Sequence, residues 1–86
     1  MLRIYGSMQC PDCVECRKNL DEARVEYEYR DFGDDLRYLK EFLAIRDSNP
    51  LFDEIKKEKK IGIPCIVEGD GTVRLDWSGY VSQAEA

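Results

Sequence analysis

The sequence predicts a small α/β domain in which a four-stranded mixed sheet is flanked by helices. Two observations support this prediction. A short apolar strand leads directly into Cys10-Pro11-Asp12-Cys13 at the start of an amphipathic helix, and a later apolar strand opens with Ile63-Pro64. Segments of strand-like and helix-like periodicity alternate between these points, which is typical of strands connected by helices. At 86 residues, the chain has room for one core only.

The N-terminal half predicts a strand, a helix and a second strand. Residues 2–5 form the first strand, and a helix follows over residues 11–24. Pro11 suits the first helical position, where its missing N–H would have no partner. The inward stripe of this helix is expected to include Val14. Residues 25–30 alternate apolar and charged side chains, which predicts a half-buried strand.

The C-terminal half predicts two further helices and a hairpin. Apolar residues at helical spacing indicate a helix over residues 35–46 and a shorter one over residues 51–60. Strands over residues 64–68 and 72–76 are joined by a turn in which Asp70-Gly71 forms a two-residue connection. Among the apolar side chains that should turn inward are Leu36 and Leu51.

The predicted order is therefore strand, helix, strand, helix, short helix, strand, strand. The first two strands are expected to run parallel through a right-handed crossover, and the last two to form an antiparallel hairpin. Because little sequence remains after Trp77, a final helix is expected to be missing or vestigial.

Composition narrows the possible partners. The formal net charge of −5 argues against nucleic acid, whose phosphates need a basic surface. The sequence contains no apolar run of the ~20 residues that a membrane span requires, and its first residues lack a signal-peptide pattern. We therefore expect a cytoplasmic monomer that binds neither nucleic acid nor membrane, and that keeps its thiols reduced.

Cys10 and Cys13 are the strongest functional signal in the chain. Two thiols separated by two residues at a helix start can form a reversible small-loop disulfide. The unpartnered N–H groups of the first turn favour a thiolate at Cys10, while Cys13 lies one turn deeper. We expect Cys10 to attack a substrate disulfide and Cys13 to resolve the mixed disulfide. The nearby carboxylates of Asp12 and Glu15 oppose this thiolate and disfavour anionic substrates.

Two further cysteines leave an alternative open. Cys16 falls on the inward stripe of its helix and is expected to be buried and inert. Cys65 follows the strand-opening proline and is expected to pack at the sheet, although it could act as a third redox thiol. Together with Cys10 and Cys13 they could instead hold zinc or an iron–sulfur cluster. A domain with the same fold and an idle dithiol is a third possibility.

The sequence resembles the glutaredoxins, which have the thioredoxin-like fold. The matching segments are Ile4-Tyr5-Gly6-Ser7, Cys10-Pro11-Asp12-Cys13-Val14 and Ile63-Pro64-Cys65-Ile66-Val67. The resemblance implies a thiol–disulfide oxidoreductase with Cys10 as nucleophile and Cys13 as resolving thiol. It also implies a cis bond before Pro64, substrate contacts from Ile63, Pro64, Gln9, Pro11 and Asp12, and no bound cofactor or metal.

The chain departs from the glutaredoxin pattern at several points. Asp12 replaces the usual aromatic residue, Ser7 stands where a lysine is common, and residues 72–77 lack the Gly-Gly-x-Asp turn that holds glutathione. The expected partners are disulfide-containing proteins or small thiols. Glutathione, another low-molecular-weight thiol or a thioredoxin-reductase-type enzyme would supply electrons. The lysine-rich segment 56–60 could meet an acidic partner, although such segments are commonly solvated helix faces.

Overall fold

The computed structural model describes residues 1–85, with side chains described through Val81. Its sheet has the strand order β2-β1-β3-β4, built from β1 (Leu2–Gly6), β2 (Tyr27–Asp31), β3 (Cys65–Val67) and β4 (Val73–Arg74). Strand β1 pairs parallel with β2 and antiparallel with β3, and β3 pairs antiparallel with β4. The predicted α/β class and four-stranded mixed sheet are confirmed.

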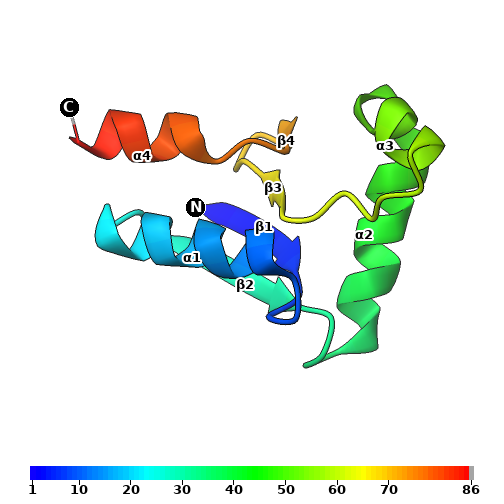
Figure 1. Cartoon of the computed structure of the whole chain (residues 1–86), viewed down its shortest axis with the longest axis horizontal. Coiled ribbons are helices and arrows are strands. Elements are labelled where there is room, and N and C mark those ends of the chain that lie inside the picture. Colours follow the sequence, from blue (N-terminus) through cyan, green and yellow to red (C-terminus); the bar gives the residue numbers. More distant parts are fainter. Residues whose placement is uncertain (86) are drawn as a thin grey trace.

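The helices cover both faces of the sheet. They are α1 (Pro11–Glu22), α2 (Leu36–Ser48), the 3-10 turn η1 (Pro50–Phe52), α3 (Asp53–Lys57) and α4 (Ser78–Glu85). Helices α1 and α4 lie together on one side, whereas α2 and α3 lie on the other side (Figure 1). Among residues 1–85, none of the helices has the length and apolar character that crossing a membrane would require.

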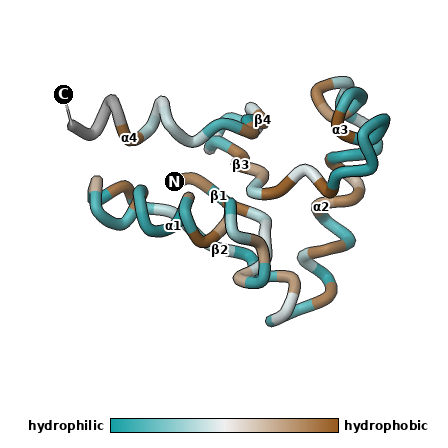
Figure 2. The backbone as a smooth tube through the Cα atoms, viewed as in Figure 1, coloured by the Kyte–Doolittle hydropathy of each residue, from teal (hydrophilic) through white to brown (hydrophobic). Residues whose placement is uncertain are grey.

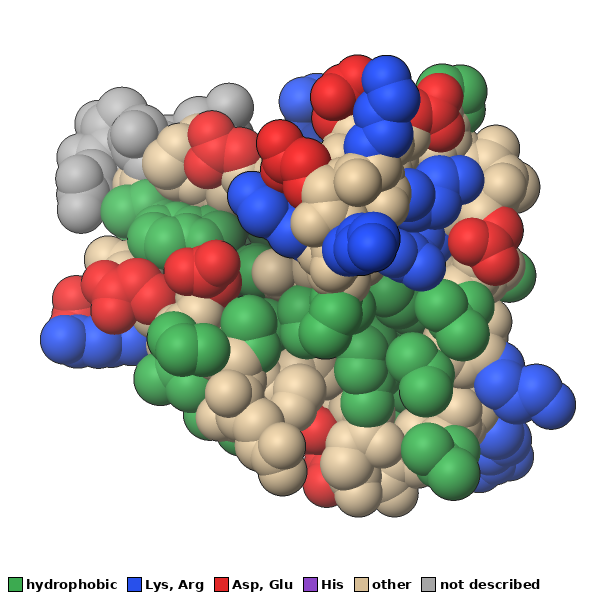
Figure 3. Space-filling view, turned by 45° about the vertical axis from the view of Figure 1, so that its right-hand side comes forward, with side chains coloured by type: hydrophobic (Ala, Val, Ile, Leu, Met, Phe, Trp, Pro, Cys, Tyr) green, Lys and Arg blue, Asp and Glu red, His purple; other side chains and the backbone are tan. Residues whose placement is uncertain are grey.

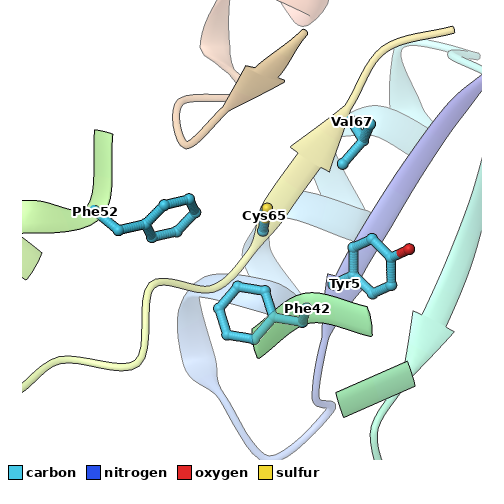
Figure 4. Packing of buried hydrophobic residues seen from close by; sticks show 5 residues of the cluster. All are labelled: Tyr5, Phe42, Phe52, Cys65 and Val67. Carbon is cyan, nitrogen blue, oxygen red and sulfur yellow. The ribbon is translucent and has the colours of Figure 1, made fainter. Parts of the chain in front are cut away.

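Each sheet face has its own buried cluster. On the α2 side, Tyr5 and Cys65 pack with Phe42, Phe52 and Val67 (Figure 4). On the α1 side, a second cluster is formed by Ile4, Cys16, Leu20 and Ile66. Side chains alternate across a strand, so neighbouring residues of β1 and β3 enter opposite clusters. Hydrophilic residues cover much of α1 and α3, as expected of helices with one face in water (Figure 2).

Two helices end earlier than predicted, at non-glycine residues in the left-handed conformation. Arg24 has φ +59, and the Val25 N–H donates to the Leu20 carbonyl at 2.9 Å. Lys59 also has φ +59, and the Lys60 N–H donates likewise to Ile55 at 3.0 Å. This pattern satisfies carbonyls at a helix end. It also takes residue 25 out of the predicted strand, so that β2 begins at Tyr27.

The C-terminal segment differs most from the prediction. The hairpin loop has three residues rather than two, because the Glu68 N–H donates to the Thr72 carbonyl. Gly71, the last of the three loop residues, has φ +93. Strand β4 ends at Arg74, and the Asp76 carboxylate accepts a hydrogen bond at 2.9 Å from the N–H of Ser78, the first residue of α4. The expectation that a final helix is missing or vestigial is therefore wrong: α4 has eight residues.

Some apolar residues predicted to be buried are exposed. Val14 is 40% exposed, Leu51 47% and Leu36 72%. In α1 the buried stripe is Cys13, Cys16 and Leu20, and Val14 falls beside it. Leu36 is the first residue of α2, where few neighbours can cover it. An apolar side chain at a helix end is therefore weak support for a core position.

Candidate active site

Cys10 lies at the N-cap of α1 and Cys13 one turn further along. Cys10 has extended backbone angles, φ −93 and ψ 120, and its N–H donates to the Ser7 carbonyl at 3.0 Å. Pro11 occupies the first helical position, as predicted. Cys10 is partly exposed, whereas Cys13 is completely buried. The structure thus gives the accessible position to the predicted nucleophile and the shielded one to the predicted resolving thiol.

The Cys13 thiol has several close partners. Burial raises the pKa of Cys13 to about 12, and the neighbouring Cys10 side chain raises it as well. The Ser7 backbone and the Tyr29 hydroxyl both lie near the sulfur, favour its charged form and lower this pKa. Cys13 is therefore a protonated thiol at neutral pH, with donors already placed beside its sulfur.

The Ile63–Pro64 peptide bond is cis, which confirms the geometry that the resemblance implied. Pro64 is buried at the entrance to β3, and Ile63 is half-buried. The preceding Gly62 has φ +98, and a Cβ there would lie 3.0 Å from the Phe52 ring. Glycine suits this position because the positive φ would strain a larger residue, and a Cβ would press against the Phe52 ring.

A groove of about 470 Å³ lies between Cys10 and this loop. Cys10 and Asp12 form one wall. The remaining lining residues are Ile55, Lys59, Lys60, Ile61, Gly62, Ile63, Pro64 and Leu75. On the side of the molecule that carries α3, hydrophobic side chains gather next to a group of lysines and arginines (Figure 3). The groove therefore combines apolar walls with charges of opposite sign on its two sides.

The basic wall is fixed to the rest of the molecule. The Arg46 guanidinium of α2 donates to the Lys60 carbonyl at 2.9 Å, and the Lys60 ammonium lies 3.1 Å from Glu58. Lys59 lies in the left-handed turn that ends α3. These contacts hold the backbone of the two lysines, whose exposed side chains remain at the groove.

The structure brings only part of the predicted site together. Asp12, Ile63 and Pro64 line the groove with Cys10, as expected for substrate contacts. Gln9 and Pro11 are exposed beside Cys10 but are not among the lining residues. Leu75, which the sequence did not single out, follows the last residue of β4 and also lines the groove.

Cys16 and Cys65 are both buried, as predicted, but on opposite faces of the sheet. Burial raises the pKa of each thiol to about 12. The four cysteines therefore do not converge, and no group of three or more His, Cys, Asp or Glu side chains within the described part of the chain is placed to hold a metal ion.

Tyr29 and Gly6 lie close to Cys13, which the sequence did not indicate. Strand pairing places Tyr29 opposite Ile4, so its ring lies on the α1 face of the sheet with Gly6. The alternation of residues 25–30 did place Tyr27 and Tyr29 on one face. Only the fold shows that this face lies under the dithiol.

Comparison with known proteins gives the relationship of the chain but no activity. No family model and no solved structure matches it. It is 36% identical over 75 residues to an uncharacterized protein of Haemophilus influenzae, and the alignment covers 87% of each chain. The chain therefore belongs to the same family as this uncharacterized Haemophilus influenzae protein.

Proposed function

We propose that the chain is a small glutaredoxin-like thiol–disulfide oxidoreductase with a thioredoxin-like fold. The observation that carries this proposal is the placement of the two thiols. An accessible Cys10 occupies the N-cap position of a helix, a buried Cys13 lies one turn further along it, and a cis Pro64 lies across a groove. The mixed sheet, with helices on both faces, is compatible with that fold.

The proposed reaction is a two-step disulfide exchange. The Cys10 thiolate attacks one sulfur of a substrate disulfide, which forms a mixed disulfide and releases the first substrate thiol. Cys13 then loses its proton to the departing second thiolate as its sulfur attacks Cys10. The Cys10–Cys13 disulfide forms, the substrate has gained two electrons, and an external thiol or dithiol reductase must return the enzyme to its reduced form.

The groove suits a substrate segment with an apolar part and a carboxylate. Ile55, Ile63 and Leu75 offer apolar contact, and Lys59 and Lys60 offer positive charge. Asp12 lies on the opposite wall and would repel a carboxylate placed beside Cys10 itself. Disulfide-containing proteins and small thiols fit this description, with glutathione, another low-molecular-weight thiol or a thioredoxin-reductase-type enzyme as reductant in the cytoplasm.

A thiol-trapping redox titration tests the proposal. The purified protein is assayed for metal, equilibrated over a range of thiol–disulfide buffers, alkylated, and mapped by peptide mass. We expect a reversible Cys10–Cys13 disulfide with a potential between about −200 and −270 mV. The Cys16→Ala variant should keep it, and the Cys13→Ala variant should lose it. Untrappable thiols with stoichiometric zinc or iron would refute the proposal.

A further inference from the structure

The Tyr29 hydroxyl lies buried beneath the dithiol helix without a hydrogen-bond partner. Its oxygen is shielded from solvent and makes no well-formed hydrogen bond to any described residue. A buried hydroxyl has lost its hydrogen bonds to water, and without a new partner its burial costs free energy. The ring is held from above by the Arg17 guanidinium, 4.3 Å from the ring centroid. The Tyr29 ring is thus held in place, although its hydroxyl makes no hydrogen bond that would stabilise the fold.

The sulfur of Cys13 lies beside this hydroxyl. A Cβ on Gly6 would lie 2.7 Å from the Tyr29 oxygen and 2.8 Å from the Cys13 sulfur, so both atoms border the same small space. Glycine leaves that space open. The charge on a Cys13 thiolate would act on the Tyr29 hydroxyl directly, and the hydroxyl stabilises the thiolate in return.

We propose that Tyr29 is a positioning residue whose O–H donates a hydrogen bond to the Cys13 sulfur as that sulfur becomes negatively charged in the resolving step. This inference rests on the proposed function. During that step the Cys13 proton passes to the departing substrate thiolate, the sulfur–sulfur bond between Cys10 and the substrate breaks, and the Cys10–Cys13 bond forms. Tyr29 keeps its own proton throughout.

The electrostatic setting makes Tyr29 a donor rather than a base. Burial raises the pKa of Tyr29 above its usual value, and the charges of Cys13 and Asp31 raise it further. Arg17 acts in the opposite direction. A phenol that holds its proton at neutral pH acts as a hydrogen-bond donor toward a sulfur that carries negative charge. Hydrogen bonds to charged groups are stronger than neutral ones, and the effect should therefore appear when Cys13 ionises.

The two sulfur steps can be timed separately with dithiobis(nitrobenzoate), whose released thiol is coloured. With one equivalent per reduced protein, Cys10 releases the first coloured thiol and Cys13 releases the second when it closes the disulfide. We expect Tyr29→Phe to slow the second phase about tenfold and to shift its pH profile to higher pH. The first phase should change far less, because Cys10 does not depend on this hydroxyl.

Tyr27→Phe is the matched control. Tyr27 lies on the same strand face and also touches Arg17, with its hydroxyl 3.3 Å from the guanidinium and 2.7 Å from Asp21. The Tyr27→Phe substitution should leave the rates of both coloured-thiol phases unchanged. An unchanged second phase in Tyr29→Phe, or equal slowing in both tyrosine variants, would overturn the role of Tyr29 alone. A wild-type protein that releases no second equivalent would overturn the proposed function together with this inference.

Discussion

The open space at Gly6 gives the sharpest test of how the dithiol is built into the fold. In Gly6→Ala the new Cβ would lie 2.7 Å from the Tyr29 oxygen and 2.8 Å from the Cys13 sulfur. Both distances are about 1 Å shorter than an ordinary contact. Overpacking of this kind costs about 1–3 kcal/mol, and the lower chain entropy of alanine returns about 0.5–1 kcal/mol. We expect a net loss of about 1–2 kcal/mol in the free energy of unfolding.

Urea denaturation of the fully reduced protein measures this loss as a midpoint about 1 M lower. Gly79→Ala is the control, because nothing lies within 4 Å of a Cβ at that exposed position. Tyr29→Phe supplies the second side of a double-mutant cycle. It removes the oxygen at 2.7 Å and leaves the ring carbon behind it at 3.4 Å, an ordinary contact. Gly6→Ala should therefore cost about 1 kcal/mol less when it is combined with Tyr29→Phe than when it is made alone. Equal losses in both backgrounds, or a Gly6→Ala midpoint equal to that of Gly79→Ala, would refute the reasoning.

Three other perturbations test separate parts of the molecule. Asp12→Asn should speed the reaction of Cys10 with glutathione disulfide several-fold, because it removes a negative charge from the groove wall; stopped-flow rates that match wild type at low salt would contradict this. Phe52→Ala should lower the free energy of unfolding in urea by about 3–5 kcal/mol, since that ring is fully buried, whereas Leu51→Ala, at a position 47% exposed, should cost far less. The Tyr5 hydroxyl and Arg30 lower the pKa of Glu41, so the ionised Glu41 side chain stabilises the folded protein. This stabilisation is fully present above the unfolded carboxyl pKa of about 4.3 and is lost as the pH falls through the lower pKa of the folded state. In thermal melts, Glu41→Gln should therefore lose less stability than wild type between pH 6 and pH 3. If the melting temperatures of the two proteins fell in parallel with pH, the proposed interaction of Glu41 with Tyr5 and Arg30 would be contradicted.

The sequence predicted the elements whose local signals agree with their tertiary environment. Pro11 fits only a helix start, and the alternation after residue 25 fits only a half-buried strand, so both elements form within a few residues of their predicted bounds. The cis bond before Pro64 followed from the resemblance and not from spacing. These features also place Cys10 and Cys13, which is why the centre of the candidate site could be predicted.

Other features depend on contacts that no local pattern shows. Arg24 and Lys59 end their helices in a conformation that usually calls for glycine, so the sequence predicted both helices too long. Asp76 was predicted to end a strand, but its side chain accepts a hydrogen bond from the N–H of Ser78, the first residue of α4. Tyr29 has the pattern of an ordinary strand residue. Its place beneath Cys13 follows from strand pairing and helix packing, which bring together segments far apart in the chain.

The separation of the cysteines by the sheet limits how the molecule can be oxidised. Four thiols could in principle scramble among several pairings. Cys65 is on the far side of the β-sheet from Cys16. Within regular helix, positions three apart hold their Cβ atoms about 5–6 Å apart, beyond the ~4.5 Å limit of a disulfide, which disfavours a Cys13–Cys16 bond. The helical spacing does not apply to the pair Cys10 and Cys13, because the backbone of Cys10 is extended rather than helical. Oxidation of the folded chain should therefore favour the Cys10–Cys13 disulfide over Cys13–Cys16 and Cys16–Cys65, so that Cys16 stays reduced when the dithiol is oxidised.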